Sequence, residues 1–159
     1  MEGKGNKRVI INHLVVPKQM KDKRKILIAV DGSEHSTKCI EYAKKHICQK
    51  DDVVMFIRAI EKLAYPYLSV EISAKNQVLT RLADNMTAKC LDNFKDNERV
   101  GYLVQGVDFR TTLIEAADKL SPDLFIIGSR GKGAVKRLLL GSVSRYLLNH
   151  LNIPTLVVK

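Results

Sequence analysis

The sequence predicts an α/β fold: an open, parallel, Rossmann-like sheet with helices on both faces. Two observations support this prediction. Short continuous apolar runs such as Ile26 to Val30 alternate with segments of helical periodicity, and the runs lack the polar alternation of a half-exposed strand. A strand that is apolar throughout is buried on both faces, which is typical of parallel sheets. At 159 residues, the chain has the length of one domain with a sizeable core.

The expected elements alternate strictly along the chain. Strands are predicted at 25–31, 53–60, 100–105, 124–128 and 153–159, and helices between them at about 33–48, 70–94, 108–120 and 142–150. Ser33 and Asp108 stand where two of the helices start, and their side chains can cap the first turn. Residues 61–69 indicate an irregular connection, because Pro66 interrupts any period. Parallel strands joined by helices require right-handed crossovers.

The N-terminal segment differs in composition from the rest of the chain. Residues 1–25 hold eight basic and two acidic side chains, which is +6 of the net charge of +10. We expect residues 1–24 to form a basic, flexible arm and residues 25–159 to form the domain. Such an arm either stays solvated or contacts nucleic acid or an anionic membrane. Its apolar stretch is short and broken, so no signal peptide is predicted and a cytoplasmic protein is the default.

The three cysteines, Cys39, Cys48 and Cys90, do not form a recognisable metal or redox motif. Their number is odd, no CxxC pair occurs, and no further ligand stands at metal-binding spacing. We expect buried or half-buried free thiols and no metal site made of protein ligands.

The segment from Gly128 to Ser144, GSRGKGAVKRLLLGSVS, follows the fourth predicted strand and carries the most chemistry. Open α/β sheets bind ligands beyond the carboxyl ends of their strands, where the strand order reverses. Four glycines allow close approach of a ligand to the backbone, and the start of the last helix offers free amides and a positive dipole end. These features suit a polyphosphate, although a tight turn and a helix cap would use the same glycines. No GxxxxGK[ST] and no GxGxxG motif is present.

The spacing Gly-x2-Gly-x9-Gly-Ser, at Gly128, Gly131, Gly141 and Ser142, resembles the ATP-binding branch of the universal stress protein family. The VDGS sequence that ends at Ser33 and the closing PTLVVK extend the resemblance over residues 25–159. It implies a five-stranded sheet of order 3-2-1-4-5 and ATP as the ligand. Any Mg²⁺ would be held through the ATP phosphates.

The resemblance also implies a position for each part of the nucleotide. Ala29 and Asp31 would lie by the adenine and ribose, Ala59 would line the adenine pocket, and the main chain of Ile127 and Gly128 would contact the ribose side. The phosphates would be surrounded by Gly131, Gly141, Ser142, Val143 and Ser144. The expected nucleotide site also includes Ser33, Ser129 and Arg130. The last strand, with Thr155, Leu156, Val157 and Val158, would pair across a two-fold axis in a homodimer.

Three functions remain open at this point: an ATP-holding homodimer in stress response or signalling, a slow ATPase, and an adaptor that binds nucleic acid or anionic membrane through the arm. Hydrolysis needs a positioned base and usually a metal clamp, and the loop contains no carboxylate. His35 and His150 are the candidate bases, and binding is favoured over turnover. Arg58 stands where the family commonly has a smaller or neutral residue, which leaves the nucleotide preference open. Tyr65 and Tyr67 could cover the pocket.

Overall fold

The computed structural model describes residues 7–11, 14, 16–61, 69–106, 108–131 and 140–159, which form a six-stranded parallel sheet of order β1-β4-β3-β2-β5-β6. The strands are β1 (Lys7–Ile11), β2 (Lys25–Ala29), β3 (Val53–Glu61), β4 (Glu98–Gly106), β5 (Leu124–Gly128) and β6 (Thr155–Val158). β2 to β6 are the five predicted strands, and their order is 3-2-1-4-5. The predicted fold class and strand order are therefore confirmed.

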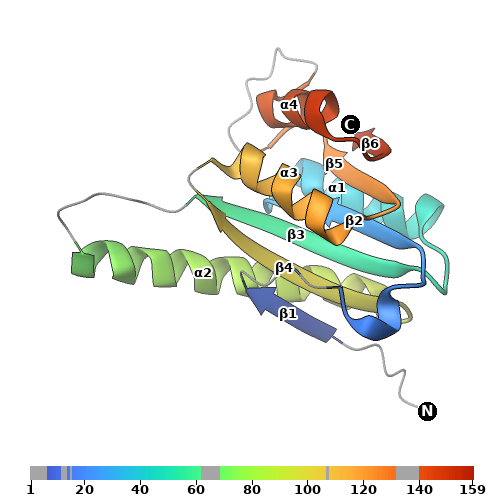
Figure 1. Cartoon of the computed structure of the whole chain (residues 1–159), viewed down its shortest axis with the longest axis horizontal. Coiled ribbons are helices and arrows are strands. Elements are labelled where there is room, and N and C mark those ends of the chain that lie inside the picture. The colour runs from blue at the N-terminus through green and yellow to red at the C-terminus, as the bar shows by residue number, and fades with distance from the viewer. Residues whose placement is uncertain (1–6, 12–13, 15, 62–68, 107, 132–139) are drawn as a thin grey trace.

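Helices cover both faces of the sheet (Figure 1): α1 (Glu34–Tyr42) and α2 (Ser69–Leu91) pack on one face, α3 (Phe109–Leu120) and α4 (Ser142–His150) on the other. Three short turns complete the described elements: η1 (Lys18–Met20), the π-helical turn η2 (Ala43–Ile47) and η3 (Asp92–Phe94). Both predicted caps are confirmed, because the side chain of Ser33 accepts from the Ser36 amide and that of Asp108 from the Arg110 amide. Tyr65 and Tyr67 lie outside the described residues.

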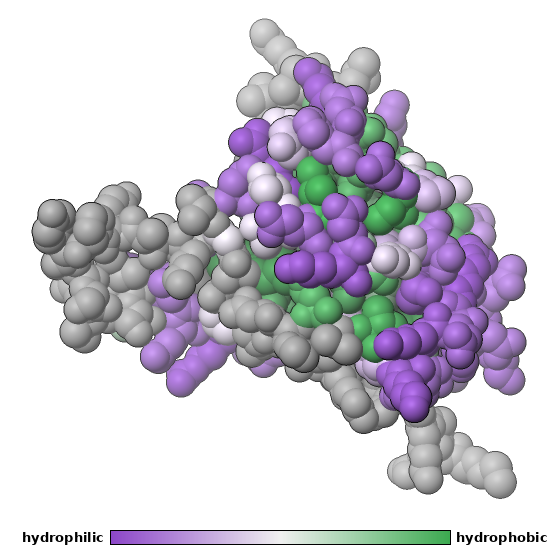
Figure 2. Space-filling model, viewed as in Figure 1, coloured by the Kyte–Doolittle hydropathy of each residue, from purple (hydrophilic) through white to green (hydrophobic). Residues whose placement is uncertain are grey.

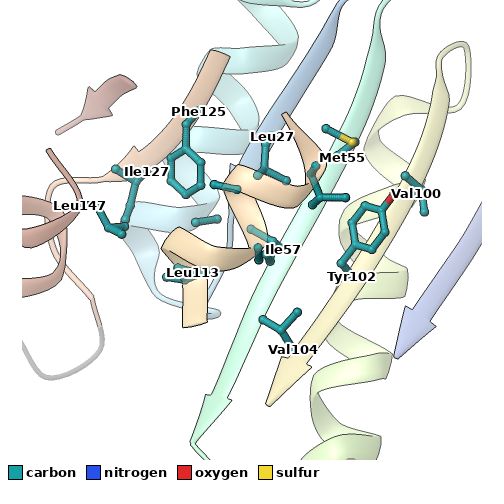
Figure 3. Packing of buried hydrophobic residues seen from close by; sticks show 14 of the residues in the cluster. Leu27, Met55, Ile57, Val100, Tyr102, Val104, Leu113, Phe125, Ile127 and Leu147 are labelled. Atoms are coloured by element: carbon teal, nitrogen blue, oxygen red, sulfur yellow. The ribbon is translucent and has the colours of Figure 1, made fainter. Parts of the chain in front are cut away.

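The core has two layers because every central strand buries both of its faces. On β2, Leu27 and Ala29 point to the side of α3, where Figure 3 shows Leu27 among Met55 and Phe125. The intervening Ile26 and Ile28 point to the side of α1 and α2. Both sets are buried, which explains why the strand sequences show no polar alternation. Polar side chains cover most of the described part of the face seen in Figure 2, and apolar residues appear between them.

A sixth strand, β1, lies at the sheet edge within the predicted arm. It pairs in parallel with β4, from Lys7 opposite Arg99 to Ile11 opposite Leu103. Its sequence, KRVII, contains three β-branched residues, which favour a strand, although the basic residues at its start suggested a solvated arm. β1 is therefore an additional strand beside the five predicted ones.

The segment from residue 16 to β2 is also packed against the domain. Met20 is fully buried in the core on the α3 side. Three basic side chains make ion pairs with acidic residues of the domain: Lys23 with Glu98, Arg24 with Asp52, and Lys25 with Asp123. The expectation of a flexible arm over residues 1–24 is wrong for β1 and for this segment, because both find partners on the sheet.

The cysteines are free thiols, as expected: Cys39 and Cys90 are buried and Cys48 is half-buried. Burial raises the pKa of Cys39 and Cys48 to about 12 and that of Cys90 to about 11. These thiols stay protonated at neutral pH, which makes them poor nucleophiles. No helix in the described part of the chain is long and apolar enough to cross a membrane.

Replacing Met20 by alanine tests whether this N-terminal segment belongs to the folded unit. Since Met20 is fully buried, we expect Met20→Ala to lower the free energy of unfolding by about 2–4 kcal/mol, measured by urea denaturation. Lys21→Ala changes an exposed neighbour and should have little effect. Equal effects of the two substitutions would show that the segment is not packed on the domain.

Candidate functional site

A cleft of about 580 Å³ opens at the carboxyl ends of β2, β3 and β5, beside the first turns of α3 and α4. β2 has β3 on one side and β5 on the other, so the strand order reverses here, as expected for a ligand site in an open α/β sheet. All the residues predicted for the nucleotide site except Ser33 and Ser129 line this cleft: Ala29, Asp31, Ala59, Ile127, Gly128, Arg130, Gly131, Gly141, Ser142, Val143 and Ser144.

Ser33 and Ser129 support the backbone around the cleft and are not among the residues that line it. Ser33 caps α1. Ser129 is 2% exposed; its amide donates to the Val158 carbonyl at 2.7 Å, and its own carbonyl accepts from the Gly141 amide at 2.6 Å. Ser129 therefore connects the end of β6, the end of β5 and the start of α4.

The N-terminus of α4 forms one end of the cleft. Gly141 is its N-cap and has no side chain to occupy the first amides. The first intrahelical bond runs from the Arg145 amide to the Gly141 carbonyl at 3.0 Å. The amides before Arg145 have no acceptor within the helix, and the helix dipole adds about half a positive charge there. With Arg130 in the same lining, this end of the cleft suits an anion.

A buried hydrogen bond anchors this helix end to the sheet. The Ser144 hydroxyl donates to the Gly128 carbonyl at 2.7 Å, and Ser144 is 2% exposed. The hydroxyl proton of Ser144 is therefore engaged within the chain, so a donation from this hydroxyl to a phosphate would require breaking this bond. Ser142, two residues earlier, is exposed at the cleft.

The loops after β2 and β5 meet through Asp31 and Gly131. The Asp31 carboxylate accepts from the Ser33 amide at 2.8 Å, across a turn in which Gly32 has a φ of 77°. A Cβ added to Gly131 would lie 2.8 Å from the Asp31 Oδ2 atom, and one added to Gly141 would lie 3.2 Å from the Ser129 carbonyl oxygen. Glycine at position 131 lets the loops after β2 and β5 approach each other, and glycine at position 141 lets the start of α4 approach the end of β5.

The rest of the lining is mainly apolar and includes residues that the sequence analysis missed. Val30 follows β2, Ile57 lies in β3 and Ser36 lies in the first turn of α1, whereas Phe109 and Leu113 come from the first turns of α3. Phe109 is 37% exposed at the cleft. The Asp108 cap was the one available signal, because it places the start of α3 at the carboxyl edge of the sheet.

Arg58, whose direction the sequence left open, lies in the cleft wall. Its side chain is half-buried, and its Nη1 atom donates to the Met86 sulfur of α2 at 2.7 Å. Burial lowers the pKa of the guanidinium, while the negative charge of Asp31 acts in the opposite direction. Its Nε atom is buried without a hydrogen-bond partner among the described residues.

Neither histidine considered as a base lines the cleft. The Nδ1 atom of His35 lies 3.4 Å from the Ser129 hydroxyl, and a Cβ on Gly128 would lie 2.8 Å from the His35 Cβ. His150, at the far end of α4, is exposed and stacks on Tyr146 with ring centroids 4.0 Å apart.

The last strand, β6, lies at one edge of the sheet and pairs with β5, from Thr155 opposite Phe125 to Val158 opposite Gly128. Thr155, Leu156 and Val157 are half-buried within the single chain. A strand at a sheet edge offers backbone groups to a further strand.

Comparison with known proteins places these features in a family. The protein-family model of the universal stress protein family matches residues 23–159 of this chain. The universal stress protein MJ0577 of Methanocaldococcus jannaschii is 26% identical over 153 residues, covering 86% of this chain and 94% of that protein. Its solved structure has a TM-score of 0.75 to this chain at 27% identity, covering 86% and 95% of the two chains.

Two further solved structures share the fold at 18% identity. A universal stress protein family member from Arabidopsis thaliana, solved with AMP bound, has a TM-score of 0.59 and is covered over 90% of its length by 86% of this chain. A universal stress protein in complex with cAMP has a TM-score of 0.64, with 86% of this chain covering 97% of it.

The two serines of the first α4 turn provide a matched test of the helix anchor. Ser144→Ala removes the bond to Gly128 and leaves a buried carbonyl without this donor, so we expect a loss of about 1–2 kcal/mol in the free energy of unfolding. Ser142→Ala changes an exposed hydroxyl and should cost much less. Chemical denaturation measures both, and a smaller loss for Ser144→Ala than for Ser142→Ala would contradict the anchor.

Proposed function

The chain belongs to the universal stress protein family, and we propose that it is an ATP-binding member of that family. In this proposal the nucleotide occupies the cleft at the carboxyl ends of β2, β3 and β5, and the protein acts as a cytoplasmic homodimer in stress response or signalling. The proposal concerns a protein that holds its nucleotide; it does not require turnover.

One observation carries the proposal: the uncapped start of α4 and the Asp31 carboxylate open into the same cleft, beside an apolar wall. The helix start and Arg130 would hold phosphates. Asp31 would accept hydrogen bonds from ribose hydroxyls, and Ala59, Ile57 and Ile127 would contact the base. The AMP and cAMP complexes of family members with the same fold support an adenine nucleotide as the ligand.

The composition of the cleft favours binding over hydrolysis. Asp31 is the one carboxylate among the described residues that line it, and its Oδ1 atom already accepts from the Ser33 amide. Neither His35 nor His150 is part of the lining. Mg²⁺ would therefore be held through the phosphates, and the chain offers no positioned general base among its described lining residues.

The ion pairs near the N-terminus reduce the support for an adaptor that binds nucleic acid or membrane. Lys23, Arg24 and Lys25, part of the basic segment, contact Glu98, Asp52 and Asp123 of the domain. Positive charge that is paired within the chain is less available to an anionic surface.

A homodimer through β6 is the second part of the proposal, and the backbone pattern of this strand supports it. The Pro154 carbonyl accepts from the Phe125 amide of β5, and the Val158 carbonyl accepts from the amide of Ser129, directly after β5. Because backbone groups alternate in direction along a strand, those of Thr155 and Val157 point to the outer edge, where a second β6 could pair.

Nucleotide binding is testable through thermal stability. A ligand at about 100 times its Kd stabilises a protein by roughly 2.7 kcal/mol, so we expect ATP to raise the melting temperature by several degrees. Gly141→Val should reduce this shift, because a branched side chain would stand at the helix start. No shift with ATP, ADP or AMP would refute the nucleotide proposal.

Gly141→Ala is a milder variant that controls for misfolding in this test. The Cβ of Gly141→Ala would meet the Ser129 carbonyl oxygen at 3.2 Å, which a small shift relieves. The ATP-dependent shift is compared with each variant's own melting temperature without ligand, so a general loss of stability is separated from a loss of binding.

The dimer is testable with a proline at the outer edge of β6. Val157→Pro removes an amide that points away from β5, so it should spare the β5–β6 ladder and block pairing with a second chain. Sedimentation analysis should find a dimer for the original chain and for Val157→Thr, and a monomer for Val157→Pro. A dimer in all three would exclude this edge as the interface.

A further inference from the structure

Arg58 reaches the cleft from β3, on the side of the sheet that faces α2. Its neighbours in sequence, Ile57 and Ala59, pack toward α3 and line the same cleft. The contact of its Nη1 atom with the Met86 sulfur brings the guanidinium beside α2 at the carboxyl edge of the sheet. A large cation thus stands next to the small residue Ala59 in the cleft wall.

Within the described part of the chain, this guanidinium donates to the Met86 sulfur, and the negative charge of Asp31 raises its pKa against the effect of burial. An arginine carries five N–H donors and no acceptor, and a thioether sulfur is a weak acceptor. The Nε atom is buried without a partner among the described residues. A buried, desolvated donor lowers stability, and such a group beside a cleft suggests a role toward a ligand.

The strand order separates Arg58 from the anion end of the cleft by about the length of a nucleoside. The phosphates would lie at β5 and α4. β2, with Asp31, is the neighbour of β5, and β3, with Arg58, is the next strand. At about 4.8 Å between strands, the backbone of Arg58 lies about 10 Å across the sheet from β5, beside which the phosphates would lie. A nucleotide that extends across the sheet would thus bring its base to Arg58.

The hydrogen-bonding groups of the bases determine which base a guanidinium can recognise. The N7 and O6 atoms of guanine are adjacent acceptors, and they match the two donors of one guanidinium edge. Adenine offers the N7 acceptor next to the N6 amino donor, which a side chain that only donates cannot satisfy. Lysine would supply charge without this fork of donors.

We propose that Arg58 recognises the base of the bound nucleotide and that the cleft thereby accepts guanine nucleotides in addition to adenine nucleotides. The inference rests on the proposed function, because it requires a nucleotide with its phosphates at α4. It assigns Arg58 as a specificity-determining residue of that same cleft.

The test compares the affinities of the full chain and Arg58→Met for GTP and ATP by calorimetry. Methionine keeps apolar packing against Met86 and removes every donor. We expect Arg58→Met to weaken the affinity for GTP by about tenfold, which is within the range of one bidentate arginine–guanine pair. The affinity for ATP should fall by less than about threefold. Arg58→Lys should weaken the affinity for GTP as much as Arg58→Met does, because lysine lacks the paired donors of a guanidinium. If Arg58→Met weakened the affinities for GTP and ATP by the same factor, or if the original chain bound ATP and not GTP, the proposed role of Arg58 would be overturned.

Analogues identify the atoms involved. Inosine triphosphate keeps N7 and O6 and should follow GTP in each variant, whereas 7-deaza-GTP lacks N7 and should bind the original chain more weakly than GTP. If 7-deaza-GTP binds as well as GTP, Arg58 does not recognise this edge. If the original chain binds neither ATP nor GTP, the proposed function itself fails, which distinguishes the two outcomes. The melting temperature of Arg58→Met without nucleotide should not fall, because the variant removes a buried unpaired donor.

Discussion

The hydrogen bond from the Gly141 amide to the Ser129 carbonyl, 2.6 Å long, fixes the geometry on which the site depends. It holds the start of α4 at the end of β5, so that the helix dipole is directed to the carboxyl edge of the sheet. The Ser129 amide in turn bonds to Val158, the last residue of β6. One residue therefore connects the anion end of the cleft with the strand at the sheet edge.

Much of the fold could be predicted because local signals and burial agree. The run from Ile26 to Val30 has no polar residue because both of its faces are buried, and Ser33 and Asp108 mark helix starts through the caps they form. β1 was missed because a strand at the sheet edge depends on its pairing with β4, about ninety residues away. The π-helical turn after α1 likewise leaves no pattern in the sequence.

The site was predictable where it follows a motif and unpredictable where it depends on packing. The glycine spacing and Asp31 identified both loops of the cleft. Phe109 and Leu113 were missed because they reach the cleft from α3, across the sheet, and no spacing relates them to the motif. Arg58 was visible in the sequence, but its direction depended on the register of β3 against β4, where it stands opposite Leu103, and on the position of Met86.

The glycines of the motif pose a question that composition alone leaves open, since a tight turn and a ligand site use the same residue. The structure gives each glycine a definite neighbour. A side chain on Gly128 would collide with His35 of α1, one on Gly131 with the Asp31 carboxylate, and one on Gly141 would press on the Ser129 carbonyl. The first contact belongs to packing of the domain, whereas the other two lie at the cleft: one joins the loops after β2 and β5, and the other joins the end of β5 to the start of α4. At Gly131 and Gly141 the interpretations as a tight turn and as a ligand site therefore coincide, because the close approach of the chain to itself forms the cleft.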